Sequence, residues 1–174
     1  FIYILFNKYH ACHYSISMKI LHIISNLNRG GAELMLKRFA EYSSIHSKDM
    51  NIIISLTDMG ALGEDLNSIP NVRVHTLEMR NFLSSFRALY KLTGKIREES
   101  PDVVQTWMYH SDLLGGIASS FAGNKNIVWN IRNTEIPQSR FRTTSLVAWI
   151  CSFLSYFVPK KIICCSHSSF LKHQ

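Results

Sequence analysis

The sequence predicts an α/β fold: a Rossmann-like, doubly wound parallel sheet in a single domain. Short apolar runs of strand length alternate, along the 174 residues, with stretches whose apolar residues recur at helical spacing. The first run, at 20–24, leads through a glycine pair, Gly30 and Gly31, into a helical pattern. A chain of this length suits one domain with a full core, because two smaller domains would each bury too little surface.

Each strand is predicted from a short apolar run that ends in turn-forming residues. The six runs occupy residues 20–24, 51–56, 72–77, 102–107, 126–131 and 162–165. The third run alternates apolar and polar residues, which indicates a more exposed strand. In the commonest Rossmann-like order, 3-2-1-4-5-6, the first and fourth strands are neighbours. Ligands bind at this switch point, off the carboxyl ends of the strands.

The helices are predicted from apolar residues that recur every three or four positions. Helical patterns begin at 32, 64, 82, 113 and 146, and Pro101 and Pro159 block two of these helices from continuing. Ser166 is expected to cap a further helix. The stretch 146–158 is apolar but too short to span a bilayer, so it is either a core helix or a helix that lies against lipid.

Residues 1–17 are expected to be an extension that precedes the domain at 18–174. A strand begins directly after Met18, and the apolar segment FIYILF is too short for a membrane span and lacks the features of a signal peptide. Translation upstream of the true start would account for the extension, as would a loosely packed tail.

The net charge of +7 and the pI of about 9.4 suggest an anionic partner. A membrane surface and a phosphorylated substrate fit this charge. Nucleic acid is not expected, because the basic residues are scattered and form no nucleic-acid-binding motif. A solvated surface with surplus lysine explains the charge equally well. If the stretch 146–161 lies on lipid, the protein is peripheral at the inner face of the plasma membrane.

The cysteines and histidines show neither disulfide nor zinc spacing, so no metal site is expected. Cys164 and Cys165 lie in an apolar run, and we expect them to be small buried side chains in a reducing, cytoplasmic compartment.

Two loops flank the predicted switch point. The first carries the glycine pair at a helix start, where unpaired N–H groups attract phosphate or another anion. The second, residues 108–112, carries His110, and polar residues follow the fifth strand nearby. A packing turn explains a glycine pair as well as a ligand loop does, and Asp112 suits a helix start better than a catalytic base. The candidate site residues are Asn28, Gly30, Gly31, Tyr109, His110, Arg132, Asn133 and Glu135.

Four segments, in order along the chain, resemble family 4 glycosyltransferases, above all enzymes of bacterial surface-polysaccharide assembly. They read SNLNRGGAE, PDVVQTWMYHSDLLGG, VWNIRNTE and IICCSHSSFLKH. The resemblance covers residues 18–174 and implies the amino-terminal half of the glycosyltransferase B (GT-B) architecture, in which two Rossmann-like domains face each other over a cleft. In such enzymes this half mainly receives the acceptor, and the other half binds the nucleotide sugar.

The resemblance also implies roles for individual residues. Gly30 and Gly31 would face the donor diphosphate, and His110 would lie near the transferred sugar as the catalytic residue. Arg132 and Asn133 match polar residues of the cleft. The implied reaction transfers a sugar with retention from a nucleotide-sugar donor to a lipid-linked or saccharide acceptor, without a metal or other cofactor.

The donor half of the family, with its Glu-x7-Glu motif, is absent from this sequence. We therefore expect the chain alone to be inactive, as a truncated product or a fragment of a longer enzyme. Two alternatives remain open. In the first, the chain is the non-catalytic acceptor half of a split glycosyltransferase. In the second, it is a different enzyme on a similar sheet, such as a nucleotide-sugar epimerase. A dinucleotide oxidoreductase is disfavoured, because the GxGxxG motif is missing and only Asp58 offers an acid after the second strand.

Overall fold

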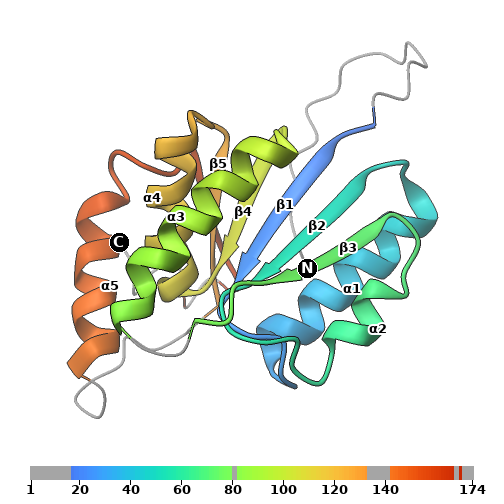
Figure 1. Cartoon of the computed structure of the whole chain (residues 1–174), viewed down its shortest axis with the longest axis horizontal. Helices are drawn as coiled ribbons and strands as arrows, with labels where there is room; N and C mark the ends of the chain where they lie inside the picture. Colours follow the sequence, from blue (N-terminus) through green and yellow to red (C-terminus); the bar gives the residue numbers. More distant parts are fainter. Residues whose placement is uncertain (1–16, 80–81, 133–141, 167–168, 170–174) are drawn as a thin grey trace.

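The computed structural model describes residues 17–79, 82–132, 142–166 and 169, which form one parallel sheet covered by helices (Figure 1). The six strands follow the order β3-β2-β1-β4-β5-β6, as the sequence predicts. All pair in parallel, and the central strand β1 pairs with β2 on one side and β4 on the other. The strands are β1 (Lys19–Ile24), β2 (Met50–Ser55), β3 (Val72–Thr76), β4 (Val103–Trp107), β5 (Ile127–Ile131) and β6 (Lys161–Cys164).

The helices form a layer on each face of the sheet (Figure 1). One layer holds α1 (Gly31–His46) and α2 (Gly63–Asn67), and the other holds α3 (Phe82–Glu99), α4 (Tyr109–Ala122) and α5 (Arg142–Leu154). Successive side chains of a strand point to opposite faces, so the two layers bury different residues of β1. Ile24 packs in the cluster with α1, and Leu21 and Ile23 pack in the cluster with α3 and α4.

Burial follows the position of each strand in the sheet. From Leu21 to Ile24 every residue of β1 is buried, as are five of the six residues of β2. The edge strands β3 and β6 are much more exposed, which confirms the expectation for the third strand. Burial on both faces explains why the central strands are nearly continuous apolar runs.

Two predicted helices begin earlier than the sequence indicates. α4 begins at Tyr109, so residues 109–112 are its first turn and not part of a loop. α5 begins at Arg142 and ends at Leu154. In both cases the first turn consists mainly of polar residues, so the apolar spacing that indicates a helix begins only one turn later. Ser166 accepts a hydrogen bond at its Oγ from the Ser169 N–H at 3.1 Å, the capping interaction expected there.

The expectation that Cys164 and Cys165 are buried is wrong. Cys164 is half-buried and Cys165 is exposed, whereas Cys151 on α5 is buried. β6 lies at the edge of the sheet, and in the described part of the chain its residues are mostly exposed. Among the described helices, none is both long and apolar enough to cross a bilayer. The predicted extension at 1–17 lies, except for Ser17, outside the described residues.

Candidate functional site

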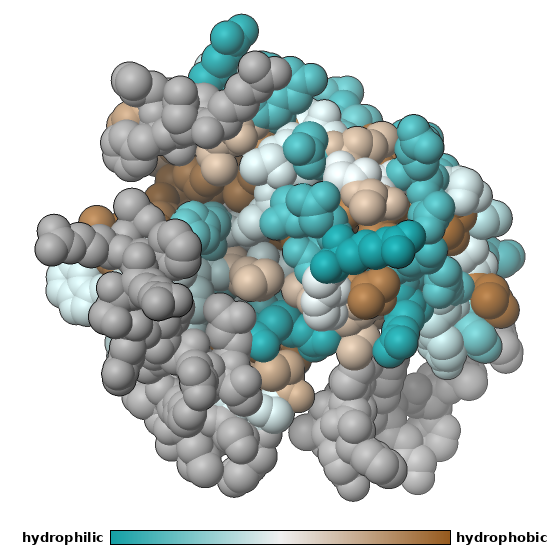
Figure 2. Space-filling model, turned by 90° about the horizontal axis from the view of Figure 1, so that it is seen from below, coloured by the Kyte–Doolittle hydropathy of each residue, from teal (hydrophilic) through white to brown (hydrophobic). Residues whose placement is uncertain are grey.

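The carboxyl ends of β1 and β4 meet at the switch point of the sheet, where the sequence predicts a ligand site. The Ser25 hydroxyl, just after β1, lies 3.1 Å from the Ser111 hydroxyl in the first turn of α4. The two segments that carry the glycine pair and His110 are thus joined by a direct hydrogen bond. Figure 2 looks onto this edge from below, where hydrophilic residues lie among less polar ones in the middle of the described surface.

The loop from β1 to α1 is shaped by its own polar residues. The Asn28 N–H donates to Asn26 Oδ1 at 2.9 Å, which forms a tight turn, while the buried Leu27 anchors the loop in the core. Gly30 is the N-cap of α1, and no side chain in the described part of the chain caps the helix. Asn28 and Gly31 are exposed. The start of α1 therefore has backbone N–H groups that no described side chain caps, an arrangement that suits an anion.

The two glycines of the pair have different surroundings. A Cβ on Gly30 would overlap the carboxylate of Glu33, which is only 7% exposed and folds back over the helix start. A Cβ on Gly31 would meet nothing within 4 Å. An acidic side chain at this place stabilises the helix and competes with an incoming phosphate. Of the two glycines, only Gly31 therefore borders open space among the described residues.

Gly60, which was not among the residues predicted for the site, also shapes the loop from β1 to α1. Gly60 has a φ of +52°, and a Cβ there would overlap the backbone of Leu27 and Asn28. The Leu62 N–H donates to the Leu27 carbonyl at 2.9 Å, and the Thr57 hydroxyl donates to the Ser25 carbonyl at 3.1 Å. The loop after β2 therefore fixes the loop after β1. A glycine in a polar loop carries no sequence signal for such a contact.

Gly60→Ala is expected to lower the free energy of unfolding by about 2 kcal/mol, because the new methyl group adds backbone overlap to an unfavourable φ. Gly94→Ala is the matched control. Gly94 lies inside α3, and its Cβ would meet nothing within 4 Å. This change should raise the free energy of unfolding by about 0.5–1 kcal/mol. Urea unfolding measures both, and equal effects of the two substitutions would contradict the proposed packing of Gly60.

The first turn of α4 carries the candidate His110. Met108, the N-cap, has a φ of 73°, which turns the chain sharply from β4 into the helix. His110 is half-buried, and burial lowers the pKa of its imidazole below 6.5. The ring is therefore mainly neutral at pH 7. No hydrogen bond to it is found among the described residues, so the ring can bond to a ligand.

Tyr109 differs from the expectation for a substrate-binding residue. It is only 6% exposed and packs in the cluster of Ile127, Trp129 and Cys151 between α4, β5 and α5. Burial raises the pKa of its phenol to about 12. The side chain belongs to the core, because the helix starts one residue after the strand and turns Tyr109 inward. We leave it out of the proposed site.

Asp112 lies beneath the site and is only 1% exposed. The Thr106 hydroxyl donates to its Oδ1 at 2.5 Å, and its Oδ2 has no hydrogen-bond partner among the described residues. Burial raises the pKa of this carboxyl to about 8, although the Thr106 hydroxyl opposes the shift. Asp112 is thus a protonated, structural group at neutral pH, in accord with the expected helix-start position.

Arg132 follows β5 directly, and its guanidinium carbon lies 5.7 Å from the centre of the Trp107 ring. This stacking holds a cation beside the end of β4. Trp107 in turn donates from Nε1 to Nδ1 of the buried His22 at 3.3 Å. The other two candidates after β5, Asn133 and Glu135, lie outside the described residues.

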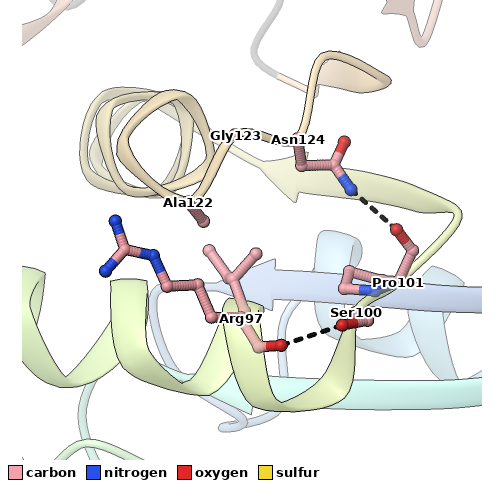
Figure 3. A pocket seen from close by; sticks show the side chains of 7 residues that line it. Arg97, Ser100, Pro101, Ala122, Gly123 and Asn124 are labelled. Atoms are coloured by element: carbon pink, nitrogen blue, oxygen red, sulfur yellow. Dashed lines mark hydrogen bonds between the residues drawn. The ribbon is translucent and has the colours of Figure 1, made fainter.

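The described residues hold no group of three side chains able to bind a metal ion. The expected independence of metal and cofactor remains a prediction. A hollow of about 260 Å³ lies at the opposite edge of the sheet, where α3 and α4 end (Figure 3). Its polar groups bond to the protein itself, as in the Asn124 side-chain amide that donates to the Pro101 carbonyl at 2.7 Å. This hollow is not the candidate site.

Comparison with solved structures identifies similar folds. HepE from Anabaena, solved in complex with UDP and glucose, is 21% identical, with a TM-score of 0.64 over 90% of this chain and 41% of HepE. UDP-N-acetylglucosamine 2-epimerase from Rickettsia bellii is 14% identical, with a TM-score of 0.62 over 90% of this chain and 41% of the epimerase. The lipopolysaccharide outer core galactosyltransferase WaaB, in its apo form, is 13% identical, with a TM-score of 0.59 over 90% of this chain and 42% of WaaB.

These likenesses show a shared fold. The expected Rossmann-like sheet, matching the amino-terminal half of GT-B enzymes, is confirmed. The chain spans about two fifths of the length of these structures. No protein-family model and no curated protein sequence matches the chain.

Proposed function

We propose that this chain is the acceptor-side domain of a retaining, nucleotide-sugar-dependent glycosyltransferase of surface-polysaccharide or glycolipid assembly. The observation that carries the proposal is the junction at the switch point, where the Ser25–Ser111 hydrogen bond joins the loop before α1 to the first turn of α4. Gly31 and His110 then border the same edge of the sheet. The solved complex of HepE with UDP and glucose, a protein of similar fold, supports this choice of ligand.

Each residue of the site has a chemical role in this proposal. The uncapped N–H groups at the start of α1 face the diphosphate of the donor, whose negative charge grows as the bond to the sugar breaks. The neutral imidazole of His110 hydrogen-bonds the transferred sugar. Arg132, held against Trp107, adds a positive charge to the cleft. The reaction then needs neither a metal nor another cofactor from this domain.

The donor-binding residues come from a second domain in this proposal, whether on the same polypeptide or on a separate one. The support is the length of the similar structures, of which this chain spans about two fifths. The chain alone should therefore be inactive. Its acceptor is a lipid-linked or free saccharide, and it works at the cytoplasmic face of the membrane.

A nucleotide-sugar epimerase is the second candidate, because the Rickettsia epimerase has a similar fold. The products distinguish the two reactions. A transferase releases the free nucleoside diphosphate only when an acceptor is present. An epimerase converts the nucleotide sugar into a stereoisomer without an acceptor.

The test measures sugar transfer by this chain when it is produced together with the polypeptide that the DNA directly downstream of its gene segment encodes. We expect His110→Ala to lower kcat/KM about 100-fold, as for the loss of a preorganised hydrogen-bond donor. Gly31→Ala should raise the KM for the nucleotide sugar about ten-fold, because the methyl group enters the space of the diphosphate. Gly94→Ala, inside α3 and far from this edge, is the matched glycine control and should leave both constants unchanged.

Three results would count against the proposal. Transfer by the chain alone would refute its role as half of a cleft. Unchanged kinetics of the His110→Ala enzyme would remove the site from the reaction. Conversion of UDP-N-acetylglucosamine to an epimer without acceptor would favour the second candidate.

A further inference from the structure

The outer face of α5 and of the turn that follows it is covered with exposed aromatic side chains. Trp149 is 72% exposed and Tyr156 is 81% exposed. Within α5 the exposed positions 146, 149 and 153 recur every three or four residues, so they lie on one side of the helix, and positions 156 and 157 follow in the turn after it. The opposite side of α5 packs in the core with β5 and α4. The exposed set, called here the α5 aromatic face, is Leu146, Trp149, Phe153, Tyr156 and Phe157.

This face lies at the outer edge of the helical layer, where no other described helix covers it (α5, Figure 1). Its rings contact one another, with Phe153 and Phe157 at 5.7 Å between ring centres. A soluble surface rarely gathers so many large apolar side chains without a partner. The α5 aromatic face is therefore expected to bind a partner.

The segment that contains α5 is strongly basic, which favours an anionic partner for this face. From residue 136 to residue 174 the sequence has five lysines and arginines and no acidic residue, so that this segment carries +5 of the net charge of +7. Lys125, Lys160 and Lys161 are exposed near the end of α5, and none forms an ion pair with a described residue. Lys19, Lys37 and Lys95, in contrast, all lie within 4.0 Å of a carboxylate.

A hollow of about 440 Å³ joins the lysines to the aromatic face. Ser120, Lys125, Phe157 and Lys160 are among the residues that line it. The Lys160 ammonium donates to Asn126 Oδ1 at 3.1 Å, which holds the cation at the rim of this hollow. An acidic group bound here would be paired with two ammonium groups and would lie next to an aromatic ring.

We propose that the α5 aromatic face and these three lysines form a docking surface for an anionic phospholipid bilayer. The aromatic rings enter the boundary between headgroups and acyl chains, and the lysines bind the lipid phosphates. At 13 residues α5 is too short to cross the bilayer and lies in the plane of the interface. This inference does not depend on the proposed sugar transfer.

A second copy of the chain fits this surface less well. A symmetric dimer through α5 would bring the same basic segment of both copies together, and like charges would repel. An anionic bilayer supplies both an apolar medium for the rings and negatively charged phosphates that pair with the lysines.

Vesicle binding tests the proposal, with Trp149 as the reporter. Trp107 and Trp129 are each 2% exposed, so a change in emission on binding comes from Trp149. The full chain is mixed with vesicles of phosphatidylcholine alone or of phosphatidylcholine with about 30% phosphatidylglycerol. We expect sedimentation with the anionic vesicles at least about ten-fold stronger than with the neutral ones, and a blue shift of the emission.

Two variants and one control separate the contributions. The double variant Trp149→Ser, Phe153→Ser should weaken vesicle binding about ten-fold or more. Replacing Lys125, Lys160 and Lys161 with glutamine should weaken it about five-fold for each lysine, and only with anionic vesicles. The control combines Tyr42→Ser and Ile45→Ser on the exposed face of α1 with Lys48→Gln just after this helix, in the other layer, and should bind like the original chain.

Several outcomes would overturn the proposal. One is equal recovery of the chain with anionic and neutral vesicles. Another is unchanged binding of the Trp149→Ser, Phe153→Ser variant, provided that its circular dichroism shows a folded protein. A concentration-dependent dimer that the same variant abolishes, without vesicle binding, would assign the face to a second copy. Emission of Trp149 that is already blue-shifted without lipid in a longer polypeptide would assign it to a further domain.

Discussion

Asp112→Asn is expected to stabilise the fold more at pH 7 than at pH 4, by a difference of about 4 kcal/mol in the free energy of unfolding. Burial raises the pKa of Asp112 from 3.8 to about 8, against a smaller opposing effect of the Thr106 hydroxyl. Between these two pH values the folded state holds a proton that the unfolded chain releases. The stability contributed by this proton is complete below pH 3.8 and is lost as the pH rises to 8.

Asparagine cannot ionise, so it removes this loss while its side-chain oxygen still accepts from Thr106. Urea unfolding at pH 4 and pH 7 measures the difference. Asp58→Asn is the control, because Asp58 is exposed and its replacement should give no comparable gain. Equal effects of Asp112→Asn at both pH values would show that Asp112 ionises normally in the folded protein.

His22→Ala is expected to lower the free energy of unfolding at pH 7 by about 4 kcal/mol. His22 is completely buried in β1 and connects two other buried side chains. Trp107 Nε1 donates to its Nδ1 at 3.3 Å, so the ring proton is on Nε2, which donates to Asn51 Oδ1 at 3.2 Å. Truncation removes the hydrogen bonds of Trp107 Nε1 and Asn51 Oδ1 to the ring, leaves Asn51 only its bond to Ser43 Oγ, and opens a cavity.

Two further variants test the cause of this loss. His22→Gln keeps one donor and one acceptor and should cost less than His22→Ala. His46→Ala, at the exposed end of α1, should change stability by less than about 0.5 kcal/mol. A His22→Ala protein within 1 kcal/mol of the original would contradict the proposed network.

Acid titration separates the two buried groups. Burial lowers the pKa of His22 to about 4, against 6.5 in the unfolded chain, while the Asn51 hydrogen bond opposes the shift. The unfolded chain therefore takes up a proton first, and stability falls as the pH drops from 6.5 to 4. Asp112 has the opposite effect in this range, so the two slopes nearly cancel in the original chain. In the Asp112→Asn protein the loss should appear, at about 3 kcal/mol.

The sequence predicted the sheet well, because its central strands are buried on both faces. Strands such as β2 are continuous apolar runs, and a run of that kind between turn residues is unambiguous. The order of the strands followed from the alternation of strands and helices. The position of the glycine pair and of His110 at one edge followed from that order alone.

The sequence did not predict what surrounds the site residues. Tyr109 was expected to face a ligand and lies in the core, because a helix that starts at once after β4 turns it inward. Gly60 shapes the loop after β1 from another loop, and Glu33 folds over Gly30. Cys164 and Cys165 read as buried apolar residues, but β6 is an edge strand.

The amino-acid pattern by itself determined the fold and the edge of the sheet at which a ligand site is expected, because periodicity and topology depend on local order along the chain. Only the tertiary structure decided that Gly31 borders open space while Gly30 faces a carboxylate, and that His110 is half-buried while Tyr109 is enclosed. It alone also showed that α5 has one packed and one exposed apolar face. Such differences depend on contacts between residues far apart in the chain, and hydropathy along the sequence does not encode them.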